Sequence, residues 1–235
     1  MVMRSWLKRK SSDLLQLRFS SSPLASVVQV DRDGAMITSL HRLYSQAIGL
    51  QVILADKVKQ WAAQSRGYLV VEEEDGRKAF ITWEEASALR EASAHPYLLS
   101  IIPVKAVDRT IEKVSRSYGG DVCRILDICR ARIVFDDIEG VSRCLLAMQN
   151  DGQVEILRLK GRMTQEEVAF CDDSNLDSFG RRDLILNVCI KNEETLCLGI
   201  ENHIAEVQLQ VVTLAALQTS EAHERYVAVR NMRRE

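Results

Sequence analysis

The sequence predicts an α+β protein in which helices pack on a mixed β-sheet. The first observation is the order of segments after Pro103, which alternate between helical and strand-like spacing. The second is the run from His203 to Val212, where apolar and polar residues alternate as in a half-buried strand. The third is composition, because 46% hydrophobic and 27% charged residues in a chain of 235 are typical of a globular protein with a sizeable core.

We expect the part of the chain before residue 101 to form a lead-in and a structural extension. Residues 1–35 show no clean periodicity, and we expect a weakly ordered basic N-terminus there. Residues 36–100 are expected to form a helical and β-hairpin extension without residues that indicate chemistry. Its expected elements are a helical segment from Ser39 to Ser65, in one piece or broken at Gly49, a hairpin turning at Asp75-Gly76, and a helix from a capping box at Thr82 to Ala94.

Residues 101–235 are expected to form the principal domain. Asp137 is a residue type that caps helices, and Asp151-Gly152 is a typical turn. The expected elements are a helix over 104–116, a strand within 124–135, a helix from Asp137 to Gln149, a strand over 154–160, a polar loop over 164–180, strands over 183–191 and 203–212, and a last helix carrying His223 and Tyr226.

Composition bounds the compartment and the partners. The six cysteines form no C-x-x-C pair and mostly lie in apolar runs, so we expect small buried hydrophobes in a reducing compartment and no zinc site. No stretch approaches the ~20 apolar residues that span a bilayer. The basic, serine-containing first 22 residues are compatible with an organelle transit peptide or with a solvated tail, and otherwise the cytoplasm is expected. The net charge of −2 argues against nucleic acid as a partner, and oligomer formation stays open.

The strand expected over 203–212 carries an unusual carboxylate. Its alternation places Glu206 and Gln208 on one face, while the other face is uniformly apolar and must meet a core. A carboxylate beside glutamines suits a groove that holds a polar ligand. An edge strand with one solvated face explains the same pattern, and both interpretations stay open.

Asp127 is a second unusual carboxylate, because it lies within an apolar run where an unpaired charge would be costly to bury. It needs a cation, which could be Arg130, Arg132 or a metal ion. Together with a carboxylate on an adjacent strand, it could hold Mg²⁺, which prefers a few carboxylates plus substrate phosphates. Such a site would polarise a phosphoryl group.

Basic residues gather before and after these carboxylates. Lys105, Arg109 and Lys113 are spaced four apart, so they are expected along one side of a helix. They could face a polyanion such as a nucleoside triphosphate, or form a solvated face with the interleaved acids. Lys160 and Arg162 add two cations at a strand end. The chain has no Walker-type phosphate loop and no dinucleotide-binding glycine motif.

Taken in order, these segments resemble the synthetase domain of RelA/SpoT-type alarmone synthetases, a nucleotidyltransferase-like fold. The resemblance covers roughly 130 residues and rests on an ordered set of short motifs. The segments are VKAVDRTIEK (104–113) for the basic helix, DICRARIV (127–134) for D-x-x-G-x-R, LKGR (159–162) for a strand-end turn, GRRDL (180–184) for G-Y-R-[SD]-[LIV], HIAEVQ (203–208) for E-[IV]-Q and HERY (223–226) for H-x-x-Y.

The resemblance implies a transferase that moves pyrophosphate from ATP to the 3′-hydroxyl of GDP or GTP. Asp127 would hold Mg²⁺, and Glu206 would bind the metal or activate the acceptor hydroxyl. The alternative is a catalytically degenerate domain that binds nucleotides or acts in regulation. The residues implied in nucleotide or phosphate binding are Lys105, Arg109, Lys113, Arg132, Lys160, Arg162, Arg182, Gln208, His223 and Tyr226.

Three positions depart from the family pattern. Arg181 replaces a tyrosine that stacks on the acceptor base, Arg130 replaces a glycine, and Pro103 replaces an arginine. A straight strand would also place Asp127 and Arg132 on opposite faces, because their spacing is odd. Both can serve one site only if the chain bends or bulges between them.

Overall fold

The protein is described from a computed structural model, which places residues 27–72, 78–92, 102–161 and 183–216. The expected polar loop at 164–180 and the last helix with His223 and Tyr226 lie outside these ranges. So do residues 1–26 of the expected lead-in, while residues 27–35 form an arm with a tight turn. Within the described ranges, no helix is both long enough and apolar enough to cross a bilayer.

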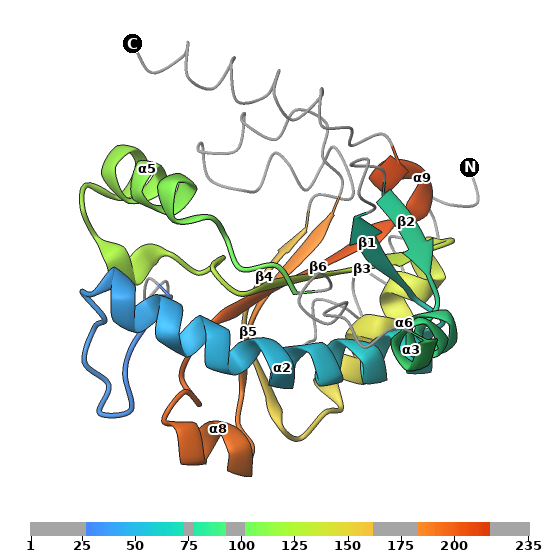
Figure 1. Ribbon diagram of the computed structural model, residues 1–235, viewed down its shortest axis with the longest axis horizontal. Coiled ribbons are helices and arrows are strands. Elements are labelled where there is room, and N and C mark those ends of the chain that lie inside the picture. The colour runs from blue at the N-terminus through green and yellow to red at the C-terminus, as the bar shows by residue number, and fades with distance from the viewer. Residues whose placement is uncertain (1–26, 73–77, 93–101, 162–182, 217–235) are drawn as a thin grey trace.

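Six strands form one mixed sheet (Figure 1). Their order across the sheet is β2-β1-β3-β6-β5-β4, in which β3 and β6 are parallel and every other neighbouring pair is antiparallel. The predicted α+β fold with a mixed sheet is confirmed. The strands are β1 (Tyr68–Glu72), β2 (Lys78–Ile81), β3 (Arg130–Phe135), β4 (Val154–Gly161), β5 (Leu184–Ile190) and β6 (Ala205–Val211).

Among the described residues the longest helix is α2, which runs along the length of the sheet (Figure 1). It begins where the Ser39 hydroxyl accepts a hydrogen bond from the Arg42 amide, and it ends at Arg66, whose φ of 56° is left-handed. Gly49 does not break it. The helices are α2 (Leu40–Ser65), α3 (Trp83–Ala92), α5 (Val107–Tyr118), α6 (Ile138–Gln149), α8 (Glu193–Leu198) and α9 (Val212–Ala216), with a 3₁₀ turn, η1, at Val122–Arg124.

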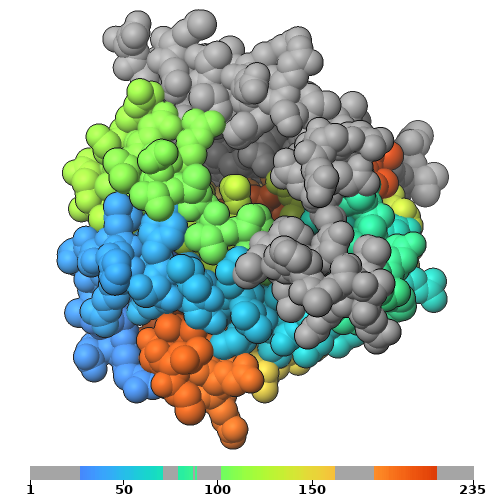
Figure 2. Space-filling model, in the orientation of Figure 1, coloured from blue at the N-terminus to red at the C-terminus, as the bar shows by residue number. Residues whose placement is uncertain are grey.

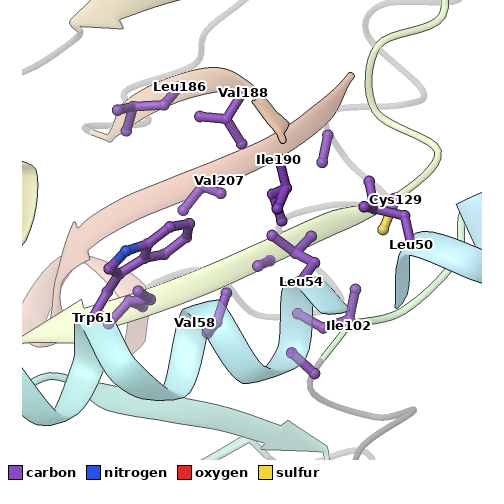
Figure 3. Packing of buried hydrophobic residues seen from close by; sticks show 14 of the residues in the cluster. Leu50, Leu54, Val58, Trp61, Ile102, Cys129, Leu186, Val188, Ile190 and Val207 are labelled. Carbon is purple, nitrogen blue, oxygen red and sulfur yellow. The ribbon is translucent and has the colours of Figure 1, made fainter. Parts of the chain in front are cut away.

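The core lies between α2 and one face of the sheet. Leu54, Val58 and Trp61 of α2 are buried against Leu186 of β5 and Val207 of β6 (Figure 3). Helix α6 packs beside α2 and closes the same layer. Burial of such side chains contributes about 1.5–3 kcal/mol each, so this layer accounts for much of the stability of the fold.

The hairpin of the N-terminal extension belongs to this sheet. Strand β1 pairs with β3, with Tyr68 opposite Val134. Gly67, just before β1, has room for no side chain, because a Cβ there would lie 2.5 Å from Ile133. The sheet and the core therefore continue across the boundary predicted at residue 101, and that division into domains stays a prediction.

Two expected elements begin later than the sequence predicts. The strand expected within 124–135 starts only at Arg130, because η1 and a bend at Ile128 precede it. The helix expected from Val104 starts at Val107, after an extended stretch in which Val104 bridges Cys129. Both corrections have one cause. The two segments pair with each other, and an apolar run alone does not show where a strand begins.

Candidate functional site

The face of the sheet opposite α2 carries a ladder of polar side chains. Residues directly paired across strands share a face, so the register places Arg130, Glu206, Asn187 and Arg158 in one row. Two residues further along the strands, Arg132, Gln208, Ile185 and Lys160 form a second row. The intervening residues point into the core. The edge-strand alternative for β6 is therefore wrong, because β6 lies between β3 and β5.

Asp127 reaches the same region from outside β3. It lies in the non-strand stretch before the bend at Ile128, so strand alternation does not separate it from Arg132. Its carboxylate receives two ammonium groups on Oδ2, from Lys105 at 2.7 Å and from Lys113 at 3.0 Å. Burial acts to raise the pKa of Asp127, but the charges of Lys113 and Lys105 outweigh it and hold that pKa below its ordinary value. Asp127 therefore stays ionised.

The two lysines come from different elements, and their environments differ. Lys105 lies in the extended stretch before α5, where its amide donates to the Ile128 carbonyl at 2.9 Å. Burial lowers the pKa of Lys105 despite its proximity to Asp127. Burial also acts to lower the pKa of Lys113, but there the Asp127 charge outweighs it and raises that pKa. The two lysines thus contact the same carboxylate oxygen, yet their pKa values shift in opposite directions.

Glu206 is the second carboxylate of the site; it is half-buried, and its pKa shifts in the opposite direction to that of Asp127. Burial raises the pKa of Glu206, and the nearby charge on Asp127 raises it further. One carboxylate oxygen accepts a hydrogen bond from Gln208 at 2.6 Å, and Gln208 in turn accepts two from Arg132 at 3.2 and 2.9 Å. The site thus holds one carboxylate whose pKa is raised beside one whose pKa is lowered.

The two carboxylates are ligands of the type that Mg²⁺ prefers. Asp127 Oδ1 is buried and has no hydrogen-bond partner in the described part of the chain. Glu206 is joined to the segment after Asp127 by its amide, which donates to the Cys129 carbonyl at 3.0 Å. No cluster of three or more histidine, cysteine, aspartate or glutamate side chains forms among the described residues. Mg²⁺ does not require one, because it binds through one or two carboxylates plus waters and phosphates.

The predicted site residues divide into three groups. Asp127, Glu206, Lys105, Lys113, Arg132 and Gln208 come together, and Lys160 lies on the same sheet face, two strands from Gln208. Arg109 does not join them: its side chain is 47% exposed and pairs with Glu112 on α5. The prediction that three cations line one side of a helix is wrong, because α5 begins at Val107 and Lys105 lies before it. Arg162, Arg182, His223 and Tyr226 lie outside the described residues.

The predicted site left out three polar residues of this face, although strand alternation placed one of them, Gln210, on the same face as Glu206 and Gln208. Arg158 alternates with Lys160, so strand spacing already placed both on one side. Asn187 interrupts an otherwise apolar strand, and Gln210 continues the alternation of Glu206 and Gln208. The Asn187 and Gln210 amide nitrogens are buried, and within the described ranges neither has a hydrogen-bond partner. Such unpaired donors are costly in a core and suit a face that meets a polar ligand.

The arrangement can bind a polyanion together with a divalent cation. Figure 2 shows a hollow beside the green segment that includes α5, and red atoms from the C-terminal part of the described chain are visible in it. The face there offers two carboxylates for a metal ion, lysine and arginine groups for phosphates, and amide donors for neutral polar groups. By contrast, a cleft of about 610 Å³ between α2 and α6 lies on the other side of the sheet, lined by Trp61 and Asp151.

Comparison with known proteins gives similarity to solved structures only. No protein-family model matches the chain, and no curated protein matches it. A GTP pyrophosphokinase family protein from Streptococcus pneumoniae is similar with a TM-score of 0.41 and 16% identity, over 53% of this chain and 57% of that one. The small alarmone synthetase 1 of Bacillus subtilis bound to its product pppGpp gives 0.42 and 17%, over 61% and 70%. Small alarmone synthetase 2 of B. subtilis gives 0.41 and 19%, over 63% and 73%. Similarity of this degree does not extend to activity.

Proposed function

We propose that this protein is a Mg²⁺-dependent pyrophosphokinase of the RelA/SpoT type, which transfers pyrophosphate from ATP to the 3′-hydroxyl of GDP or GTP. The observation that carries the proposal is the convergence of Asp127 and Glu206 beside Lys105 and Lys113. Carboxylates on opposite sides of the sheet would have excluded it. The ordered family motifs in the sequence supply the reaction class, which the geometry alone would leave open.

The donor half of the site comprises Asp127, Lys105, Lys113 and Arg132. Bound Mg²⁺ would neutralise the β- and γ-phosphate charge of ATP and polarise the phosphoryl group. Lys105 and Lys113, which contact Asp127 here, would contact phosphate oxygens of the bound nucleotide. Arg132, already oriented by its two hydrogen bonds to Gln208, would hold a phosphate oxygen on the neighbouring row.

The acceptor half is centred on Glu206. Ionised Glu206 would take the proton of the 3′-hydroxyl as the bond from O3′ to the β-phosphorus forms. The bond from the β-phosphorus to the oxygen bridging to the α-phosphate breaks, and AMP leaves with that oxygen. The raised pKa of Glu206, caused by burial and by Asp127, suits a group that must both accept and release a proton.

The test is incubation of the purified protein with γ-labelled ATP, Mg²⁺ and either GDP or GTP, followed by chromatography. We expect a product that carries the label on the guanine nucleotide, formed together with AMP. Heat-treated protein and reactions with EDTA are the blanks. A folded protein that forms no such product with either acceptor contradicts the proposal.

A second candidate is a nucleotide-binding module without catalysis. The observation that favours it is Arg130, which replaces the family glycine and lies directly opposite Glu206 in the β3–β6 pairing. Its charge acts to lower the pKa of Glu206. Calorimetry distinguishes the two, because a module would bind ATP or GDP while the labelled assay shows no transfer.

A further inference from the structure

The arm at residues 27–35 contains one buried glutamine, Gln29. Val30 bridges Met36, and the Asp31 carboxylate accepts the Asp33 and Ala35 amides, which closes a tight turn. Gln29 lies just before this turn and is fully buried. The sequence offered no sign of this role, because the arm falls in a segment without periodicity.

The Gln29 side chain joins two segments that are far apart in sequence. Its amide nitrogen donates to the Ile125 carbonyl at 3.0 Å and to the Ile204 carbonyl at 2.9 Å. Its amide oxygen accepts the Ile204 N–H at 2.9 Å. The Gln29 backbone adds a hydrogen bond from its amide to the Cys123 carbonyl at 2.7 Å. Both side-chain donors and the acceptor are therefore satisfied by backbone groups of two different segments.

Each anchored residue lies two positions before a carboxylate of the site. Ile125 precedes Asp127, and Ile204 precedes Glu206. After these points the two segments are joined again, because the Glu206 amide donates to the Cys129 carbonyl and β6 pairs with β3. Gln29 thus joins the two segments just before the β3–β6 pair begins, at the end of the pair where Asp127 precedes β3 and Glu206 is near the start of β6.

We propose that Gln29 is a positioning residue that sets the separation of Asp127 and Glu206. The inference rests on the proposed function and adds a residue from the N-terminal arm to it. The physical reason is that a metal ion shared by two carboxylates tolerates little change in their distance, and displacements of about 1 Å can cost ~100-fold in rate. A glutamine with three backbone bonds resists such a change, whereas an apolar side chain of similar size fills the space without joining the segments.

The test variant is Gln29→Met, which keeps the volume and removes all three side-chain hydrogen bonds. The matched control is Thr195→Val in α8, a fully buried residue whose hydroxyl also bonds backbone groups, those of Asn192. In Figure 1, α8 lies well away from α5. Both variants remove buried hydrogen bonds, and their free energies of unfolding are measured together so that loss of stability is compared directly.

The first readout is amide hydrogen exchange followed by NMR on the full chain. The informative amide is that of Glu206, which bonds Cys129 and not Gln29. We expect Gln29→Met to increase its exchange by ~10-fold or more, while Thr195→Val changes it no more than the rest of β6. An unchanged Glu206 amide, with faster exchange at Ile204 only, would show that Gln29 caps one strand and sets no separation.

The second readout is the kinetics of transfer. We expect Gln29→Met to lower kcat by about 10–100-fold with the KM for ATP within about 3-fold, and Thr195→Val to change neither by more than about 3-fold. In a Glu206→Gln background, Gln29→Met should cost almost nothing further, since the residue acts through Glu206. A full additional loss in that background would overturn the inference. If the unaltered protein transfers nothing, the proposed function fails and the exchange at Glu206 decides the role of Gln29 separately.

Discussion

Two lysine–aspartate clusters, each with one buried member, lie on opposite sides of the same sheet. They differ in how many of the aspartate oxygens accept a hydrogen bond or ion pair. Asp151, on the helix side, accepts Lys57 on both oxygens, the Trp61 indole N–H on Oδ2 and the Gln153 amide on Oδ1. Asp127, on the polar side, accepts two lysines on one oxygen, and its other oxygen has no hydrogen-bond partner among the residues that the structure describes.

The difference separates a structural ion pair from a candidate site. Burial acts to raise the pKa of both aspartates, and lysine partners hold both below the ordinary value. Charge and burial alone therefore do not distinguish them. Only Asp127 has an open oxygen and a second carboxylate near enough to raise the pKa of that neighbour, Glu206. An unsatisfied buried acceptor beside surplus cations is a stronger sign of a ligand than a shifted pKa.

The largest expected contrast is between Asp127→Asn and Asp151→Asn. Asp151→Asn leaves Lys57 without its counterion and Asp127→Asn leaves Lys105 without its own, with side chains only 9% and 12% exposed, so each variant should lower the free energy of unfolding by about 3–5 kcal/mol. Only Asp127→Asn should also reduce the transfer rate, by ~10³-fold or more, because it removes the charge that would hold the metal ion. Denaturant unfolding and the labelled-ATP assay measure the two effects.

If Asp151→Asn unfolds at the assay temperature, the double variant Lys57→Met/Asp151→Asn replaces it, because removing both charges leaves no uncompensated ion. Equal loss of transfer in a folded Asp151 variant would show that the contrast between the two clusters is not functional.

The next largest effect is expected at Glu206, the carboxylate that lies near Asp127 and has no counterpart near Asp151 among the described residues. Glu206→Gln should lower kcat by about 10²–10³-fold, because the amide cannot accept the proton of the 3′-hydroxyl. Its stability at neutral pH should equal or exceed that of the unaltered protein, since a carboxylate with a raised pKa destabilises the fold when ionised. Chemical denaturation at pH 7 checks the sign. A strongly destabilised Glu206→Gln protein would assign the residue a structural role like that of Asp151.

The mixed sheet could be predicted from the sequence because strand and helix periodicity are local signals. Asp127 and Glu206 could be singled out for the same reason. Glu206 was visible from strand alternation, and Asp127 from its cost within an apolar run. The expected helical row was wrong at Lys105, because the pairing of Val104 with Cys129 delays the helix. Arg109 does lie on α5, but its side chain pairs with Glu112, and its role in phosphate binding stays a prediction. Gln29 could not be found, because its partners are backbone groups 96 and 175 residues away and no side-chain pattern encodes them.

The pH dependence should sharpen the contrast between the carboxylates. Glu206 must be ionised to act as a base, and burial and Asp127 raise its pKa above the ordinary 4.5. The rate should therefore rise with pH through a limb displaced above 4.5, while Asp127, whose pKa is lowered, stays ionised throughout. A profile of kcat/KM against pH measures the limb, and Glu206→Gln should lose it. A limb at or below 4.5 would place the titrating group elsewhere.

The smallest expected effect is at Arg109, which helical spacing assigned to the phosphate site. Its side chain is 47% exposed and pairs with Glu112, whereas Lys113 on the same helix reaches Asp127 at 3.0 Å. Arg109→Ala should change kcat/KM by less than about 3-fold, because an exposed ion pair is worth about 0–1 kcal/mol. Lys113→Ala should lower it by ~10-fold or more, since it removes a charge-assisted bond beside the metal ligand. Both are measured at subsaturating ATP, where phosphate contacts contribute most to the rate. A loss at Arg109 equal to that at Lys113 would mean that the exposed side chain of Arg109 also contacts the nucleotide. The site would then include Arg109 together with Asp127, Lys105 and Lys113.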